Sequence, residues 1–148
     1  MLSERKKTAP LGKILLQLKK ITFAQLGQAL IVQKEKMPDK RIGEILVYLS
    51  FISEDELAYA LALQYQYPSL DLKNYSINQE ALALISKETA EKNLILPLDI
   101  FDDILTVTVL NPLHRDVFDE ISKNTGKELR LFVSSRQDIL SVINTLYK

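Results

Sequence analysis

The stretch Arg41–Gln64, RIGEILVYLSFISEDELAYALALQ, decides the fold, because most of it already occurs earlier in the chain as PLGKILLQLKKITFAQLGQALIVQ, Pro10–Gln33. Several positions are identical when the two copies are aligned: Gly12/Gly43, Ile14/Ile45, Leu15/Leu46, Leu18/Leu49, Ile21/Ile52, Leu26/Leu57, Ala29/Ala60, Leu30/Leu61 and Gln33/Gln64. A repeated hydrophobic core explains the apolar pairs. It does not by itself explain why a glycine and a glutamine are repeated.

Each copy has the pattern of a short helix, a tight turn and a longer helix. Thr22 with Gln25, and Ser53 with Glu56, have the spacing of a capping box, which marks the start of each longer helix. Pro38 prevents one continuous helix between the copies. Two copies are too few for a solenoid, so we expect a paired arrangement about a pseudo-twofold axis. The spacing i, i+3, i+4, i+7 places one set of four residues per copy on a single helical face: Leu26, Ala29, Leu30, Gln33 and Leu57, Ala60, Leu61, Gln64.

The pattern changes after Gln64. The sequence predicts, in order, a short strand after Pro68, a helix begun at Asn78 within INQEALALISKETAEKNL, strands LILPLDIF and ILTVTVLNP joined at Asp102 and Asp103, a helix from about His114 to Asn124 closed by Gly126, a strand ELRLFVSS, and a final helix capped by Ser134 or Ser135. The fold class is therefore α+β. We expect a helical tandem-repeat subdomain over residues 1–66 and a small β-β-α-β-α subdomain over residues 67–148, which together form one domain.

Composition limits the classes of function. The 148 residues include no cysteine, which excludes disulfides and thiolate chemistry and suits a reducing compartment. No apolar run is long enough to span a bilayer and no signal peptide is recognisable, so we expect a cytoplasmic protein without direct membrane insertion. Net charge is zero, although residues 1–40 hold nine Lys/Arg and three Asp/Glu. This basic segment can attract a phosphate or an acidic partner, but the balance disfavours extended nucleic-acid binding.

Residues that could carry catalysis are scarce. His114 is the only histidine, and no G-x-S-x-G pattern supports a nucleophile. The four glycines belong to no phosphate-binding loop, so the chain cannot be a P-loop ATPase on its own. The aspartates and glutamates lack metal-loop spacing. We therefore expect no catalytic residue, metal or cofactor, and a protein that is not an enzyme.

The repeat itself has the features of a ligand site. Gly12 and Gly43 stand at the openings of the short helices, where the absence of Cβ lets another group approach backbone N–H donors. The guanidinium of Arg41 suits bidentate bonding to guanine or a phosphate. The second copy also supplies an apolar floor and a neutral amide at its edge, which completes the description of a nucleotide site: Leu57, Leu61 and Gln64.

Both copies resemble the paired motif RLGxxLLxxGLLxxxxLxxxLxxQ of the MshEN domain, the amino-terminal domain of type II secretion and type IV pilus assembly ATPases. The downstream segments QYPSLDL, EALALISKETAEKNLILPL and ILTVTVLNPL are also similar to that domain. The resemblance implies binding of cyclic di-GMP by both copies. The positions that it assigns to the ligand are Leu11, Gly12, Leu15, Leu26, Leu30 and Gln33 in the first copy, Arg41, Ile42, Gly43, Leu46, Leu57, Leu61 and Gln64 in the second, and Asn111 downstream.

The sequence departs from this motif at four places. Pro10 takes the place of the first arginine and supplies neither charge nor donors, and Lys7 and Lys13 are the candidates to replace it. Asn111 stands where the family often has aspartate. The mid-motif glycines are replaced by Lys19 and Ser50, each costing on the order of 1 kcal/mol if the residue is left-handed.

Two functions fit these features. One is a noncatalytic regulatory module that binds cyclic di-GMP and relays its occupancy to an assembly ATPase or to an inner-membrane component of a secretion or pilus system. Through such partners the protein is expected at the inner face of the cytoplasmic membrane. The alternative is a docking module of the same machinery, with nucleotide binding weakened or lost. Arg41 favours the first function and Pro10 favours the second.

Overall fold

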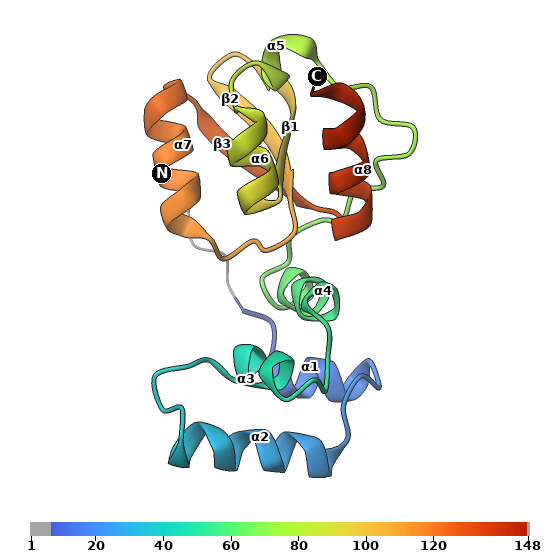
Figure 1. Cartoon of the computed structure of the whole chain (residues 1–148), viewed down its shortest axis with the longest axis vertical. Helices are drawn as coiled ribbons and strands as arrows, with labels where there is room; N and C mark the ends of the chain where they lie inside the picture. Colours follow the sequence, from blue (N-terminus) through green and yellow to red (C-terminus); the bar gives the residue numbers. More distant parts are fainter. Residues whose placement is uncertain (1–6, 148) are drawn as a thin grey trace. The chain divides into compact units, whose positions relative to one another are not determined.

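The computed structural model describes residues 7–147, which form two compact units, one up to Gln66 and one from Tyr67 onward (Figure 1). The first unit contains both copies of the repeat and only helices: α1 (Leu11–Gln17), α2 (Phe23–Glu35), α3 (Ile42–Tyr48) and α4 (Glu54–Gln64). The predicted pattern of a short and a longer helix in each copy is confirmed.

The repeated sequence produces the same local hydrogen bonds twice. The hydroxyl oxygens of Thr22 and Ser53 accept from the backbone N–H of the residue three positions on, so both capping boxes form as predicted. In both copies the residue after the C-cap of the short helix has positive φ, 59° at Lys19 and 63° at Ser50. In the first copy the amides of Lys19 and Lys20 donate to Leu16 and Leu15, and the second copy repeats this Schellman pattern.

The helices of the two copies are exchanged in their packing. The longer helix of the first copy, α2, packs on α3, while α1 packs on α4, and the two short helices contact each other. Ile14 and Ile45, which occupy equivalent positions, are both buried. Because each longer helix packs on the short helix of the other copy, the end of each longer helix lies near the start of the other copy's short helix.

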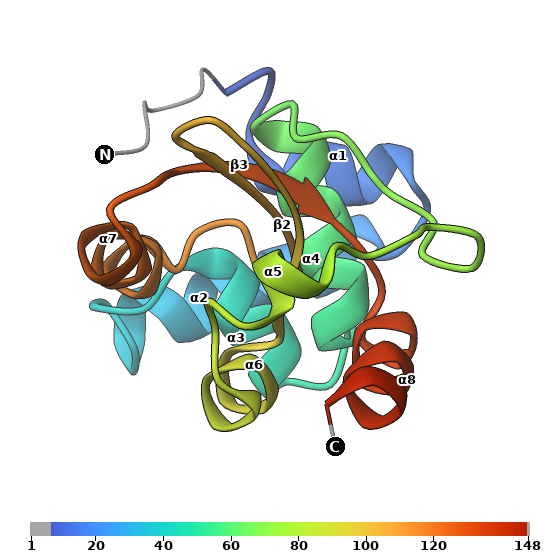
Figure 2. The same cartoon turned by 90° about the horizontal axis from the view of Figure 1, so that it is seen from above.

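The second unit is an α+β layer, as predicted. Its elements are α5 (Gln79–Leu82), α6 (Lys87–Asn93), β1 (Ile95–Phe101), β2 (Ile104–Val109), α7 (Arg115–Thr125), β3 (Glu128–Val133) and α8 (Arg136–Leu146). The sheet order is β1-β2-β3, with β1 antiparallel and β3 parallel to β2. Asp102 and Asp103 join β1 to β2, and α7 provides the crossover to β3. Figure 1 and Figure 2 both show α6 lying between α7 and α8.

The core of this unit lies on the sheet. Leu96, Leu105 and Val107 are completely buried, as are Ile139 and Ile143 of α8. The predicted end of α7 is confirmed, since Gly126 has φ 71° and its amide donates to Ser122.

Two element predictions in this unit are wrong. Instead of a strand after Pro68, the chain forms one isolated bridge, between Ser69 and Val133, because the side chain of Asp71 accepts from the amide of Lys73 and turns the chain. The helix expected from Asn78 is two short helices. Asn78 caps the first as predicted, but Ser86 accepts from the amide of Thr89 and starts a second, so the backbone breaks between them.

Candidate functional site

The two repeated glutamines make equivalent hydrogen bonds to opposite copies. The side-chain Nε2 of Gln33 donates to the backbone oxygen of Lys40 at 2.8 Å, and Nε2 of Gln64 donates to the backbone oxygen of Ala9 at 3.0 Å. Lys40 and Ala9 directly precede the N-cap residues of α3 and α1. Each glutamine therefore holds the start of the short helix in the other copy, which gives the repeated amide a structural reason.

The repeated glycines allow close packing within the same arrangement. A Cβ added to Gly43 would lie 2.6 Å from Cδ1 of Leu57 and 2.9 Å from Cδ2 of Leu11. A Cβ added to Gly12 would lie 3.1 Å from Cδ1 of Leu26. Leucine side chains thus occupy the space beside both glycines. That a ligand also approaches the glycine amides stays a prediction.

Arg41 is the charged group of the candidate site. It is exposed and serves as N-cap of α3, with φ −78° and ψ 153°. Within residues 7–147 its guanidinium makes no hydrogen bond or ion pair. Because Gln33 of α2 bonds to the neighbouring Lys40, the start of α3 lies at the end of the α2 face that also bears Leu30.

Burial divides the predicted site residues into two groups. Leu15 and Leu46 have no exposed surface and Leu11 is also buried, so these side chains serve the core, and the backbone of Gly43 is buried as well. Equivalent positions of the two copies differ: Leu30 is 48% exposed, whereas Leu61 is 6% exposed. Gln64 is buried and Gln33 is half-buried. The residues with exposed or half-buried surface around the start of α3 are Gln33, Arg41, Ile42 and Leu57, and Leu30 lies on the same face of α2 as Gln33. Leu26 lies beside Gly12 of α1 instead.

The start of α1 lacks such a charged group. Pro10 is the exposed N-cap of α1. Of the two candidate replacements for an arginine, Lys7 places its ammonium 5.7 Å from the ring centroid of Tyr65, a cation–π distance, and Lys13 lines a different hollow. The exposed half of the site therefore centres on Arg41.

Asn111 belongs to the second unit, in the loop after β2. Its Oδ1 accepts from the amide of Leu113 at 2.9 Å, and its Nδ2 lies 3.4 Å from Nε2 of His114. These bonds shape the start of α7, and they provide a local reason for an asparagine before Pro112.

Glu56 is an ionisable residue of the repeat whose pKa lies below its ordinary value. Its carboxylate accepts from the backbone amide of Ser53 at 2.9 Å, which lowers the pKa. Partial burial opposes this effect, and Lys20, at 3.3 Å, reinforces it. The equivalent residue of the first copy is the neutral Gln25, so the two copies respond differently to pH.

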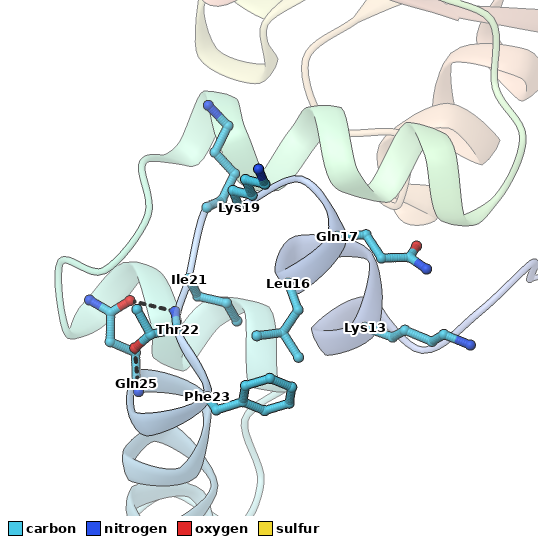
Figure 3. Close-up of a pocket in the computed structure, with 9 residues that line it drawn as sticks. Lys13, Leu16, Gln17, Lys19, Ile21, Thr22, Phe23 and Gln25 are labelled. Carbon is cyan, nitrogen blue, oxygen red and sulfur yellow. Dashed lines mark hydrogen bonds between the residues drawn. The ribbon is translucent and has the colours of Figure 1, made fainter.

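A further hollow, of about 700 Å³, lies where α1 leads into α2 (Figure 3). Leu16, Ile21 and Phe23 form its apolar lining, and Lys13, Lys19 and Lys20 lie around them. Phe23 is 81% exposed. The sequence analysis missed this surface because it concentrated on positions that are identical in the two copies. Phe23 is not one of them, since its equivalent in the second copy is Glu54. That difference between the copies was the available signal.

The described part of the chain contains neither a candidate metal site nor a candidate membrane-spanning helix. Residues 7–147 contain no group of three or more side chains placed to hold a metal ion. No helix among them combines the length and apolar character needed to cross a membrane.

Comparison with known sequences identifies a family and several relatives of this chain. The sequence model of the MshEN domain matches residues 65–148, more than half of the chain. The type IV pilus assembly ATPase PilB of Myxococcus xanthus is 29% identical over 93% of this chain and 24% of its own length. Bacteriophage adsorption protein B of Escherichia coli K12 is 26% identical over 93% of this chain and 18% of its own length. The chain thus spans about a quarter or less of these relatives.

Solved structures share the fold. The structure of MshE with cyclic di-GMP superposes with a TM-score of 0.71 at 23% identity, covering 95% of this chain and 99% of that one. The N-terminal domain of XpsE gives a TM-score of 0.72 at 19% identity, covering 99% and 100%. Both matches include the tandem repeat as well as the sheet, and so support the helical architecture of the first unit and the α+β architecture of the second.

Proposed function

The chain belongs to the MshEN domain family, and from that premise we propose that it is a noncatalytic regulatory module that binds cyclic di-GMP. The observation that carries the proposal is the environment of Arg41, an exposed guanidinium without a protein partner among the described residues. It lies at the end of a helix face that exposes Leu30. A guanidinium fork for guanine or phosphate beside an apolar surface is a suitable arrangement for a purine nucleotide.

The wider role is part of the same proposal. The module relays its occupancy to an assembly ATPase or to another component of a secretion or pilus system on the cytoplasmic side of the membrane. Similarity to PilB supports this partner class. Similarity to a bacteriophage adsorption protein indicates that related segments also occur in proteins that are not named as assembly ATPases. The residues proposed to meet the ligand are Leu26, Leu30, Arg41 and Ile42, with Gly12 and Gly43 offering backbone amides.

Isothermal titration of the chain with cyclic di-GMP tests this function. We expect heat from the parent protein and a loss of about tenfold to a hundredfold in affinity for Arg41→Ala, because a hydrogen bond to a charged group contributes roughly 1.5–3 kcal/mol. Lys40→Ala is the control, since it removes the same charge one residue away and leaves the backbone oxygen that Gln33 binds. Equal affinity of parent and Arg41→Ala, or silence of the parent, contradicts the proposal.

Docking of an acidic partner segment is the second candidate function, and the hollow at α1 and α2 favours it. Phe23 is 81% exposed and forms a contiguous apolar lining with Leu16 and Ile21, which three lysines surround. This combination complements an amphipathic segment with leucines on one face and glutamates on the other.

A fluorescein-labelled peptide of that amphipathic design is a direct probe of docking. We expect Phe23→Glu to abolish its binding by placing a like charge on the apolar surface. Phe101→Glu is the matched control, because Phe101 is 76% exposed but lies in the other unit. Equal peptide binding by both variants would exclude the hollow as the docking site.

A further inference from the structure

The two glutamine bonds obey the internal repeat. Adding the repeat offset to Gln33 and Ala9 gives Gln64 and Lys40, so the bonds Gln33–Lys40 and Gln64–Ala9 are one interaction formed twice with the copies exchanged. In both cases a side-chain amide donates to the carbonyl that precedes an N-cap residue.

This bond acts on the direction of the next side chain. A carbonyl oxygen lies in the plane of its peptide group, so holding the Lys40 oxygen fixes the peptide plane that leads into Arg41. The oxygen of Arg41 in turn accepts from the amide of Ile45 at 3.2 Å. Arg41 is therefore held on both sides, by Gln33 before it and by the first turn of α3 after it.

The equivalent bond, from Gln64 to the oxygen of Ala9, precedes Pro10, a residue without a polar side chain. Gln64 holds the oxygen of Ala9 and so fixes the peptide plane that leads into Pro10, whose own oxygen accepts from the amide of Ile14 at 3.2 Å. Pro10 has a fixed φ and no charge to aim. Identical bonds thus have unequal consequences for a ligand.

We propose that Gln33 of the first copy is the positioning residue for Arg41 of the second copy, and that Gln64, although it belongs to the same copy as Arg41, has little influence on it. The proposal rests on the proposed binding of cyclic di-GMP by Arg41. It assigns the repeated glutamine a role in trans, across the repeat, rather than a ligand contact within its own copy.

The variants Gln33→Met and Gln64→Met test this role, because methionine keeps the length of the side chain and removes the N–H donor. We expect Gln33→Met to weaken cyclic di-GMP binding by about fivefold, the usual effect of one neutral hydrogen bond, and Gln64→Met to change it by less than about twofold. Gln64 is the more buried of the two. A purely structural role therefore predicts the larger loss for Gln64→Met, and that result overturns the proposal.

Amide exchange measured by NMR without ligand keeps this test separate from the proposed function. Gln33→Met is expected to speed exchange of the Ile45 amide by about fivefold and to leave Ile14 unchanged, and Gln64→Met to do the reverse. If the parent fails to bind cyclic di-GMP, the proposed function is contradicted, while this crossed pattern still supports positioning by Gln33. Exchange that changes within the same copy, or in neither, overturns it.

Discussion

At the residue scale, Gly43 is the position where the packing of the repeat leaves no room for a side chain. Gly43→Ala places Cβ 2.6 Å from Leu57 and 2.9 Å from Leu11, so both leucines have to move. We expect the free energy of unfolding to fall by about 1–2 kcal/mol, the usual cost of overpacking, as measured by urea denaturation. Gly12→Ala, with its nearest contact at 3.1 Å, is expected to cost less.

Gly27→Ala is the internal control for this series. A Cβ at Gly27 meets nothing within 4 Å, and the residue lies inside α2. Alanine is there expected to raise the free energy of unfolding by roughly 0.5–1 kcal/mol, because glycine is unfavourable in a helix interior. Equal effects of alanine at Gly27 and Gly43 would refute the packing role of the repeated glycine.

Lys19 and Ser50 carry backbone strain that glycine removes. Both have positive φ, and an L-residue with a Cβ pays about 1 kcal/mol or more in that region. Lys19→Gly and Ser50→Gly are each expected to raise the midpoint of thermal unfolding, by an amount that corresponds to roughly 0.5–1 kcal/mol. Alanine at the same positions keeps the strain, so a comparable gain from alanine would show that φ is not the cause.

The sequence alone identified the special residues of the repeat, but it did not identify the residues that they contact. The alignment of the copies marked both glycines and both glutamines, and comparison with the family motif marked Lys19 and Ser50 as the positions where a left-handed residue would be strained. It did not predict that Gln33 and Gln64 bond to opposite copies, because a hydrogen bond depends on the packing of α2 on α3 and of α1 on α4. It also gave Leu30 and Leu61 one role, whereas their exposure differs.

At the scale of elements, the two capping boxes differ in their response to acid. The folded-state pKa of Glu56 lies below its ordinary value of 4.5, so the unfolded chain binds more protons between those two values. The contribution of Glu56 to stability is therefore complete above pH 4.5 and is lost as the pH falls through the lowered pKa. We expect Glu56→Gln to flatten this part of the pH profile of thermal unfolding.

Gln25→Glu is the converse test, because it gives the first copy the charged box of the second. Its profile should gain a fall in stability below pH 4.5. Unchanged profiles in both variants would mean that these carboxylates titrate alike in the folded and unfolded chain.

The helices with strong caps and the strands with alternating apolar residues were predictable element by element. The errors arose where side chains compete locally with regular structure. Ser86 bonds to the amide of Thr89 and divides one apolar helical pattern into α5 and α6, and Asp71 turns the chain after a single bridge at Ser69. Such short-range bonds are invisible to hydrophobic periodicity.

At the scale of the whole molecule, each longer helix of the repeat packs on the short helix of the other copy, but only the second copy carries an arginine, Arg41. Pro10→Arg restores the missing group at the start of α1, and we expect it to tighten cyclic di-GMP binding by about tenfold or more, since a charge-assisted bond contributes roughly 1.5–3 kcal/mol. Pro38→Arg adds the same charge at another exposed proline and is the control. An equal gain from both would indicate attraction by charge alone, and no gain would indicate that the first copy no longer offers the right geometry.

The four glycines make the central claim measurable in a single NMR titration with cyclic di-GMP, since glycine amides occupy a distinct region of the spectrum. Gly12 and Gly43 open the short helices, whereas Gly27 lies within α2 and Gly126 ends α7 in the other unit. The account predicts that the amide signals of Gly43 and Gly12 shift saturably while those of Gly27 and Gly126 remain in place. Saturating nucleotide that moves none of the four signals, or that moves Gly126 without the repeat glycines, would contradict it.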